Sequence, residues 1–419
     1  MNAHCAKFTS PFAPLQLSDT DVSTLEQLSR TIVSNYVTQY EQYALQGAGA
    51  QGVDKRIWKP VKHHRGVCVF AQRKSQTEED PMDEIRQSID SFTGSGAVQP
   101  SDLPVMLTVG SIPGTLDDVM YGLMCPTIED MRVKTSYIDD QVADVAVLQT
   151  ITVPTLDDPY QSLVIKWAHN RLNLLRRSLI SYRDFVYMVR TGIVHTSTGE
   201  RLGFHLMHSV HFPQTHELPP IQRGNMSVCG LYRDNPERTQ VEVFARGIMD
   251  PRGSAPQLLI IQAAADMFIS VAKNVECSYH KKLMWQLRLK QRTESSSSSS
   301  SDKLSFSSDK RDLQCTTCKR TSSKVLRILG DPLKRRCALC AKYVCSSCRI
   351  KKTLSHLTCA TSKLWRREFA FCGACFSEAC RSDAFSIALH EFVLLDANKG
   401  DSRSFREDFD SFTSSSVCA

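Results

Sequence analysis

The sequence lacks three features that would mark a membrane protein, a secreted protein or a common hydrolase. It has no charge-free apolar run of about 18 residues, because Gln257, Gln262 and Asp266 interrupt the nearest one, so we expect no transmembrane segment. The first residues lack the apolar stretch of a secretory signal, and we therefore expect an intracellular protein. The common motifs of nucleotide hydrolases, zinc proteases and serine hydrolases are missing, which argues against an enzyme.

A strong excess of one charge sign is lacking too. The 419 residues carry 51 Lys+Arg and 44 Asp+Glu, and a net charge of +7 does not indicate a nucleic-acid partner. Hydrophobic residues make up 42% of the chain, which is enough for real cores, and the length favours about two or three domains.

A run of seven serines, residues 295–301, is too polar to belong to a core and divides the chain. The region before it is poor in cysteine, whereas ten of the 16 cysteines fall between Cys315 and Cys380. We expect a first domain at residues 15–290, a linker at 291–305, a small second domain at 306–380 and a Ser/Asp-rich tail at 381–419.

Hydrophobic periodicity in the first domain predicts an α+β fold with a mostly antiparallel sheet. Ser18 and Asp19 can cap a helix that reaches Tyr40, and residues 115–123 and 255–289 also have helical spacing. The strand-like runs are grouped without alternating helices, which argues against a parallel sheet. These runs are residues 57–62, 66–72, 103–109, 142–153, 162–168, 184–194, 201–210, 226–232 and 240–248, with a turn expected at residues 63–65.

The helix at residues 255–289 is apolar over most of its circumference, so it must be enclosed, and a curved sheet is the expected partner. Small Ala264 and Ala265 leave room there for a ligand, but a fully packed core helix is the simpler interpretation. His205, His208 and His211 do not predict a shared metal site, because in a strand His208 faces away from the other two.

The order of elements, residues 110–118 (Gly-Ser-Ile-Pro-Gly-Thr-Leu-Asp-Asp), Tyr182-Arg183-Asp184-Phe185 and the closing helix resemble a START-type lipid-transfer domain. The resemblance covers about residues 15–290. It implies a helix-grip fold, in which the sheet clasps the last helix around a tunnel for one lipid, and a structural role for Asp184. Ile261, Ala265 and Phe268 are the residues expected to bound that tunnel.

Four Cys-x2-Cys pairs give the strongest pattern in the chain. Each pair can deliver two sulfurs to one ion, so eight ligands predict two Zn²⁺ sites. Only four residues separate the second pair from the third, too few for both to reach one ion, so the first and third pairs should share one zinc and the second and fourth the other. The expected ligands are Cys315, Cys318, Cys345 and Cys348 for the first zinc, and Cys337, Cys340, Cys372 and Cys375 for the second.

The spacing of these pairs is similar to that of FYVE-type zinc fingers. The resemblance implies a headgroup site at Asp309, Lys334, Arg335 and Arg336, although the family's histidines are missing from the basic motif. A net charge of +12 over residues 303–379 is retained, which predicts weak, salt-sensitive binding to anionic membranes. A solvated basic face is the alternative. RING and PHD fingers share the crossed layout but usually add a histidine ligand, and His356 is a poor candidate for it.

We therefore expect a non-enzymatic lipid-binding protein that is cytoplasmic and peripherally associated with endosomal or other membranes. Its partners would be a lipid in the START-like pocket, a phosphoinositide or other anionic membrane, and proteins bound by the finger. The alternative is a RING- or PHD-like zinc module for protein interaction or ubiquitin transfer.

Overall fold

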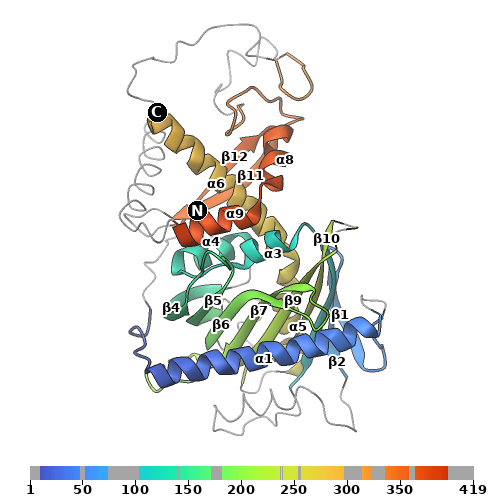
Figure 1. The fold of residues 1–419 in the computed structure, drawn as a ribbon, viewed down its shortest axis with the longest axis vertical. Coiled ribbons are helices and arrows are strands. Elements are labelled where there is room, and N and C mark those ends of the chain that lie inside the picture. The colour runs from blue at the N-terminus through green and yellow to red at the C-terminus, as the bar shows by residue number, and fades with distance from the viewer. Residues whose placement is uncertain are drawn as a thin grey trace. The chain divides into compact units, whose positions relative to one another are not determined.

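A computed structural model describes residues 10–47, 52–73, 103–138, 142–170, 182–235, 237, 239–252, 256–296, 314–321, 336–357 and 364–394. The chain divides into two compact units, and the division falls between Val275 and Glu276. The first unit has the expected α+β composition, with a large antiparallel sheet and helices (Figure 1).

The first unit is built on one ten-stranded sheet with the order β1-β2-β3-β10-β9-β7-β6-β5-β4, in which β8 pairs with β6. All the ladders are antiparallel except the short one between β6 and β8. The strands are β1 (Trp58–His64), β2 (Val67–Gln72), β3 (Val105–Pro113), β4 (Val142–Thr152), β5 (Ser162–Asn170), β6 (Arg183–His195), β7 (Arg201–Ser209), β8 (Gln222–Arg223), β9 (Asn225–Asn235) and β10 (Gln240–Asp250).

Helix α1 (Asp19–Leu45) covers one face of this sheet, which we call the outer face. The Ser18 side chain accepts a hydrogen bond from the Asp21 backbone, and the Asp21 side chain accepts one from Ser18 in return, so a capping box starts the helix. Ile32 and Tyr36 of α1 belong to one buried cluster with alternate residues of the strands, such as Phe204. This cluster is the main core of the unit.

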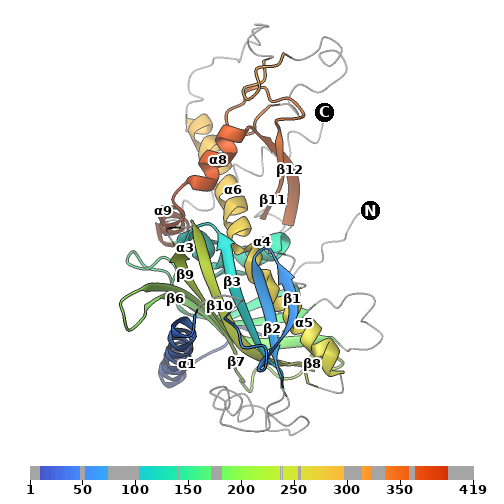
Figure 2. The same cartoon turned by 90° about the vertical axis from the view of Figure 1, so that its right-hand side faces the viewer.

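The opposite face, which we call the inner face, is covered by helices α3 (Leu116–Leu123), α4 (Ile128–Ile138) and α5 (Gln257–Ile269). Helix α5 contacts β1, β2, β3 and β10, and Figure 2 shows α1 and α5 on opposite sides of the sheet. A second buried cluster joins Met131 of α4 to Tyr187 and Val189 of β6, with Met207 and Met267 packed against it.

The structure corrects three details of the predicted elements. His63 and His64 lie in β1, and the turn is formed by Arg65 and Gly66, whose φ angles of 48° and 84° suit a two-residue hairpin. The long helix is interrupted by the 3-10 turn η3 (Ser270–Lys273), where the Ser270 hydroxyl donates to the Met267 carbonyl. Helix α4 was not expected.

The second unit begins inside helix α6 (Asn274–Ser296) and continues with β11 (Ile350–Leu357), β12 (Leu364–Phe371), α8 (Gly373–Arg381) and α9 (Ala384–Leu389). Its core combines Leu283, Met284 and Leu287 of α6 with cysteines and with apolar residues such as Phe371. The finger core therefore includes residues that precede the serine run. This grouping differs from the expected boundary at residue 290.

The predicted tail also begins with folded structure. Asp383 caps α9 by accepting hydrogen bonds from the backbones of Phe385 and Ser386, and a π-helical turn, η6 (His390–Leu394), follows. Arg288 of α6 forms an ion pair of 3.3 Å with Glu391. Residues 384–394 thus belong to the finger's unit rather than to a polar tail.

By length and hydropathy, the helical run Gln257–Gln291 could cross a membrane, contrary to the expectation based on its polar residues. A core helix of a soluble protein meets the same criterion. In the structure Ala264, Ala265 and Phe268 of this run are buried, and α5 contacts four strands of the sheet. This is the environment of a core helix.

Candidate metal centres and ligand-binding face

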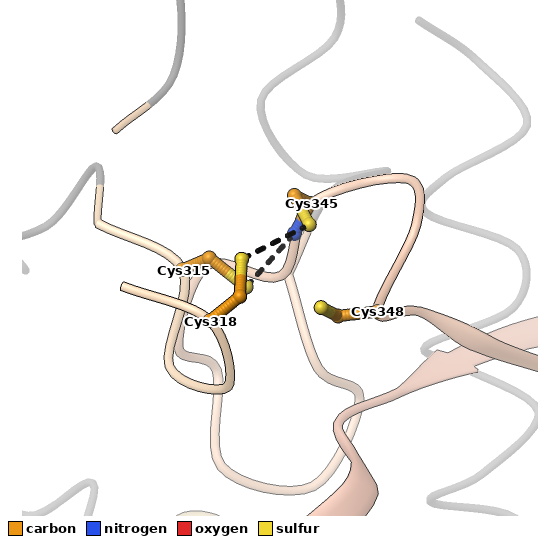
Figure 3. Close-up of side chains that lie close together, drawn as sticks. All are labelled: Cys315, Cys318, Cys345 and Cys348. Carbon is orange, nitrogen blue, oxygen red and sulfur yellow. Dashed lines mark hydrogen bonds between the residues drawn. The ribbon is translucent and has the colours of Figure 1, made fainter. Parts of the chain in front are cut away.

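Four sulfurs come together in the first candidate metal centre, from Cys315, Cys318, Cys345 and Cys348 (Figure 3). Their sulfur atoms all lie within 4.8 Å of one another, and the Sγ atoms of Cys318 and Cys345 are 3.7 Å apart. The Cys345 backbone N–H donates to the Cys315 sulfur at 3.4 Å. The first and third pairs are thus joined, as in the crossed arrangement.

The second centre gathers Cys337, Cys340, Cys372 and Cys375, again with all sulfurs within 4.8 Å. The Sγ atoms of Cys340 and Cys372 lie 3.9 Å apart. Cys372 is the N-cap of α8, and its sulfur accepts a hydrogen bond of 3.4 Å from the Cys375 backbone. The first turn of a helix therefore supplies one half of this centre.

The first pair of each centre lies in the same kind of tight turn. The Lys319 backbone N–H donates to the Cys315 carbonyl, and the Ala341 backbone N–H donates to the Cys337 carbonyl, both at 2.9 Å. Lys319 and Ala341 have φ angles of 61° and 58°, in the left-handed region. This shared geometry folds the backbone amides of both turns toward the sulfurs, as in a zinc knuckle.

The thiols of the first centre are strongly perturbed by one another. Burial alone would raise the pKa of Cys315, but backbone N–H donors, with that of Cys345 first, lower it to about 6. Hydrogen bonds with the thiols of Cys345 and Cys318 raise the pKa of Cys348 to about 12. Four thiolates this close repel one another, so a bound cation is needed for all four to ionise together.

The sulfur positions fit a tetrahedral metal ion. Four sulfurs at about 2.3 Å from a Zn²⁺ ion would lie about 3.8 Å from one another, which agrees with the two separations given above. A metal bound by these eight residues would hold four chain segments together and leave no open coordination position for catalysis. In the part of the chain that the structure describes, no histidine or carboxylate joins either group.

Of the expected headgroup residues, only Arg336 lies within the described ranges; Asp309, Lys334 and Arg335 lie outside them. The Arg336 guanidinium donates to the Ala341 carbonyl at 3.0 Å, on the second knuckle turn. A more conspicuous surface lies on β12, where Trp365 is 41% exposed and is followed by exposed Arg366 and Arg367. The sequence patterns did not single out these three residues.

The expected tunnel residues lie on α5. Ala265 and Phe268 are buried, and Ile261 is half-buried. Across from this helix, on the inner face of central strand β7, the side chains of His205 and Met207 keep part of their surface accessible. Burial nevertheless lowers the pKa of His205 well below its usual range. These two residues are therefore surrounded by protein without being closely packed.

Two lysines close to this face were missed. Lys166 of β5 is buried and donates to the Cys125 carbonyl at 2.6 Å, and Lys134 lies on the buried side of α4. Lys166 lies within a strand whose other residues are mostly apolar, so its burial was predictable from its neighbours. The capping box formed by Thr127 and Asp130 is the sequence feature that would have revealed α4.

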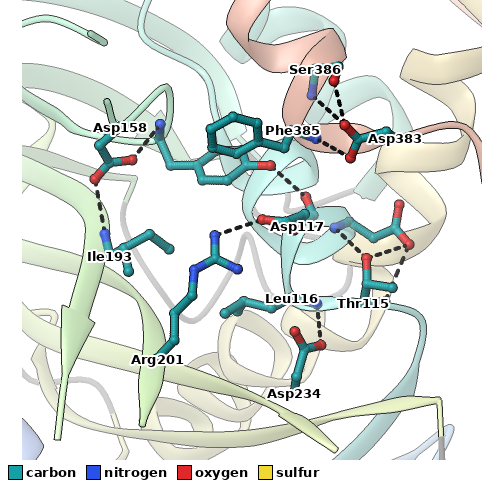
Figure 4. A network of polar contacts seen from close by, with 12 residues as sticks. Thr115, Leu116, Asp117, Asp158, Ile193, Arg201, Asp234, Asp383, Phe385 and Ser386 are labelled. Carbon is teal, nitrogen blue, oxygen red and sulfur yellow. Dashed lines mark hydrogen bonds and ion pairs between the residues drawn. The ribbon is translucent and has the colours of Figure 1, made fainter. Parts of the chain in front are cut away.

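The other motifs of the first unit are structural. Residues 110–118 connect β3 to α3, and Asp234 accepts a hydrogen bond of 2.6 Å from the Leu116 backbone (Figure 4). In the same network Arg201 forms an ion pair of 2.8 Å with Asp117, and Asp158 accepts from the Ile193 backbone at 3.2 Å. These bonds anchor α3 and the loop before β5 to the ends of the strands.

No family model and no curated protein matches this chain. Three solved structures resemble it weakly. The human StAR-related lipid transfer protein 5 is 18% identical, with a TM-score of 0.40, and the match covers 61% of this chain and 97% of that one.

The STAR-related lipid transfer protein from Xanthomonas axonopodis is 16% identical, with a TM-score of 0.35, over 52% of this chain and 96% of that one. The lipid transfer and protein localization domain of human StarD13 is 9% identical, with a TM-score of 0.34, over 58% and 95%. These scores are low, so the strand order and the packing of α5 carry the description of the fold.

Proposed function

We propose that the first unit binds a lipid between the inner face of its sheet and α5, and that the finger binds two zinc ions and attaches the protein to anionic membranes. The observation that carries the first part is the state of His205 and Met207. In a well-packed core, side chains at the centre of a sheet would be fully buried, as their neighbours Leu206 and His208 are.

The chemistry of the surrounding side chains suits an apolar ligand. Tyr187, Val189 and Met267 belong to the cluster that Met207 joins, and Ala264 and Ala265 bring the backbone of α5 near the sheet. Methionine side chains adapt to ligands of irregular shape, because they are unbranched and polarizable. A single acyl chain or sterol body is the class of ligand that such walls would accept.

The test of the first part is lipid uptake by the full-length protein. Ala265→Trp would fill the space beside the sheet, whereas Leu258→Trp places the same ring at a position of α5 that is 63% exposed. We expect native mass spectrometry after incubation with mixed liposomes to show retained lipid in the wild type and in Leu258→Trp but not in Ala265→Trp. Equal retention by all three, or a collapse of Ala265→Trp on heating, would favour a fully packed core.

The second part rests on the two four-cysteine groups and on the surface of β12. Trp365 combines an apolar body with a polar N–H, and the guanidinium groups beside it suit anionic lipid headgroups. This pairing favours peripheral attachment to a cytoplasmic, anionic membrane such as the endosomal one. Attraction of this kind is non-directional, so we propose little preference among phosphoinositides.

Liposome co-sedimentation tests this part. Binding of the full chain to phosphatidylserine vesicles should weaken steeply with salt, and Arg366→Gln with Arg367→Gln, or Arg335→Gln with Arg336→Gln, should weaken it further. Selectivity for phosphatidylinositol 3-phosphate that persists at high salt would show placed ligands instead. Ubiquitin discharge by the wild type without liposome binding would favour the RING-like alternative.

A further inference from the structure

Helix α4 turns one basic residue toward the protein interior. Its buried residues are Met131, Lys134 and Ile138, which share one face of the helix. Lys134 is only 9% exposed, yet it forms no hydrogen bond and no ion pair anywhere in the described ranges. A buried ammonium group without a partner is costly, so such groups are normally paired.

Lys134 lies near two further basic groups of the inner face. Met131, one turn before it on the same side of α4, belongs to the cluster against which Met207 packs, and His205 is the next residue on that side of β7. Lys166 reaches the same region from β5, where its ammonium group contacts the chain just before α4, at the Cys125 carbonyl. The positive charges of Lys134 and Lys166 add to the lowering of the pKa of His205.

No acidic group neutralises this cluster within the described residues. The closest carboxylate in electrostatic terms is that of Asp130, which accepts hydrogen bonds from the Thr127 backbone and hydroxyl at 3.3 and 2.7 Å. No ion pair joins a carboxylate to Lys134 or to Lys166 in the part of the chain that is described. The inner face therefore has a surplus of positive charge next to apolar walls.

We propose that Lys134, assisted by Lys166 and His205, binds the anionic head of the ligand whose apolar part lies between the sheet and α5. This inference rests on the proposed lipid-binding function and narrows its ligand to amphiphiles with a carboxylate or a phosphate monoester. An anion supplies the counter-charge that the protein does not, and the His205 imidazole can donate an N–H to the same head.

A pair of matched fluorescent probes tests the inference on the full-length protein. cis-Parinaric acid and its methyl ester have the same chain, but only the acid is anionic. We expect the wild type to bind the acid at least about tenfold more tightly than the ester, which is a modest yield for one buried charge-assisted contact. Lys134→Met keeps the aliphatic stem and removes the charge, so it should abolish the preference by weakening the acid alone.

Two controls make the result specific. Lys59→Met removes a charge at an exposed position of β1 and should leave both affinities unchanged. His205→Gln should reduce the preference for the acid less than Lys134→Met does. Displacement of the ester by lysophosphatidic acid or by oleic acid, each compared with uncharged monoolein, tells a phosphate-binding site from a carboxylate-binding one.

The outcomes separate the two proposals. Equal binding of acid and ester by the wild type, or a preference that survives Lys134→Met, would overturn the anionic-head inference while leaving lipid binding intact. Failure of the acid, the ester and neutral liposome lipids to bind at all would instead overturn the proposed function.

Discussion

The Asp184 carboxylate, which has no exposed surface, accepts two hydrogen bonds from the Arg223 guanidinium, at 3.0 and 2.9 Å. It also accepts one from the Trp167 indole N–H at 2.8 Å. The Asp184 side chain thereby joins β5, β6 and β8 at one end of the sheet. The structural role that the START resemblance implied for this residue agrees with these contacts.

Replacing this carboxylate should be severe. Asp184→Asn leaves the Arg223 charge buried without a counter-charge, and we expect a loss of about 3–5 kcal/mol in the free energy of unfolding. Glu200→Gln removes a carboxylate from a partly exposed ion pair with Arg233 and should cost less than about 1 kcal/mol. Urea denaturation of both variants checks the difference, and similar midpoints would contradict it.

The metal content of the finger provides the second prediction. The purified chain should carry two zinc ions, and Cys345→Ser should lose the ion of the first centre, because three sulfurs and a hydroxyl bind zinc much less tightly. Cys380→Ser is the matched control, since Cys380 belongs to neither group. Elemental analysis combined with native mass spectrometry counts the ions, and a folded wild-type finger without metal would refute the assignment.

The third prediction concerns the contribution of α6 to the finger. Leu283 is fully buried among finger residues although it precedes the serine run, so Leu283→Ala should destabilise this unit by about 2–5 kcal/mol. Hydrogen exchange of the β11 and β12 amides reports the effect. Leu258→Ala, at an exposed position of α5, should leave that exchange unchanged. Unaltered protection in Leu283→Ala would mean that the finger folds without α6.

A pH prediction follows from His208, which is buried and contacts the Ser227 hydroxyl at 3.0 Å. Burial lowers the pKa of His208 from 6.5 to about 4. The unfolded chain therefore binds a proton that the folded one does not, so this histidine lowers stability as the pH falls from about 6.5 to about 4, by about 3 kcal/mol in all. His208→Asn should flatten the pH dependence of unfolding in that window, whereas His63→Asn, at an exposed position of β1, should not.

The sheet was largely predictable from the sequence, because its strands alternate between two faces and end at clear breaks. Pro113-Gly114 ends β3, and Ser18 starts α1 as the capping pattern indicates. The crossed cysteine groups followed from one short spacing, since the four residues between Cys340 and Cys345 keep neighbouring pairs apart. These features depend on local chemistry.

The parts that were missed depend on contacts distant in sequence. Lys134 appears in a mixed polar segment, and nothing local shows that its side of α4 is buried. The role of α6 was missed because the serine run marks a break in composition, whereas Leu283 and Leu287 pack with residues beyond that run. Hydrophobic periodicity shows that a face is buried but not which segment covers it.

The unequal attachment of the two sides of the sheet bears on how a ligand would enter. The outer side is sealed by α1 and the main core, and displacing that helix would expose many large side chains. On the inner side, α5 ends at the 3-10 turn, Asp266 pairs with Lys62 of β1, and Lys273 donates to the Ile138 carbonyl of α4 at 2.7 Å. Breaking two such polar ties costs little compared with opening a core. Entry and exit would thus be gated by α4 and α5, with the sheet and α1 acting as a fixed wall.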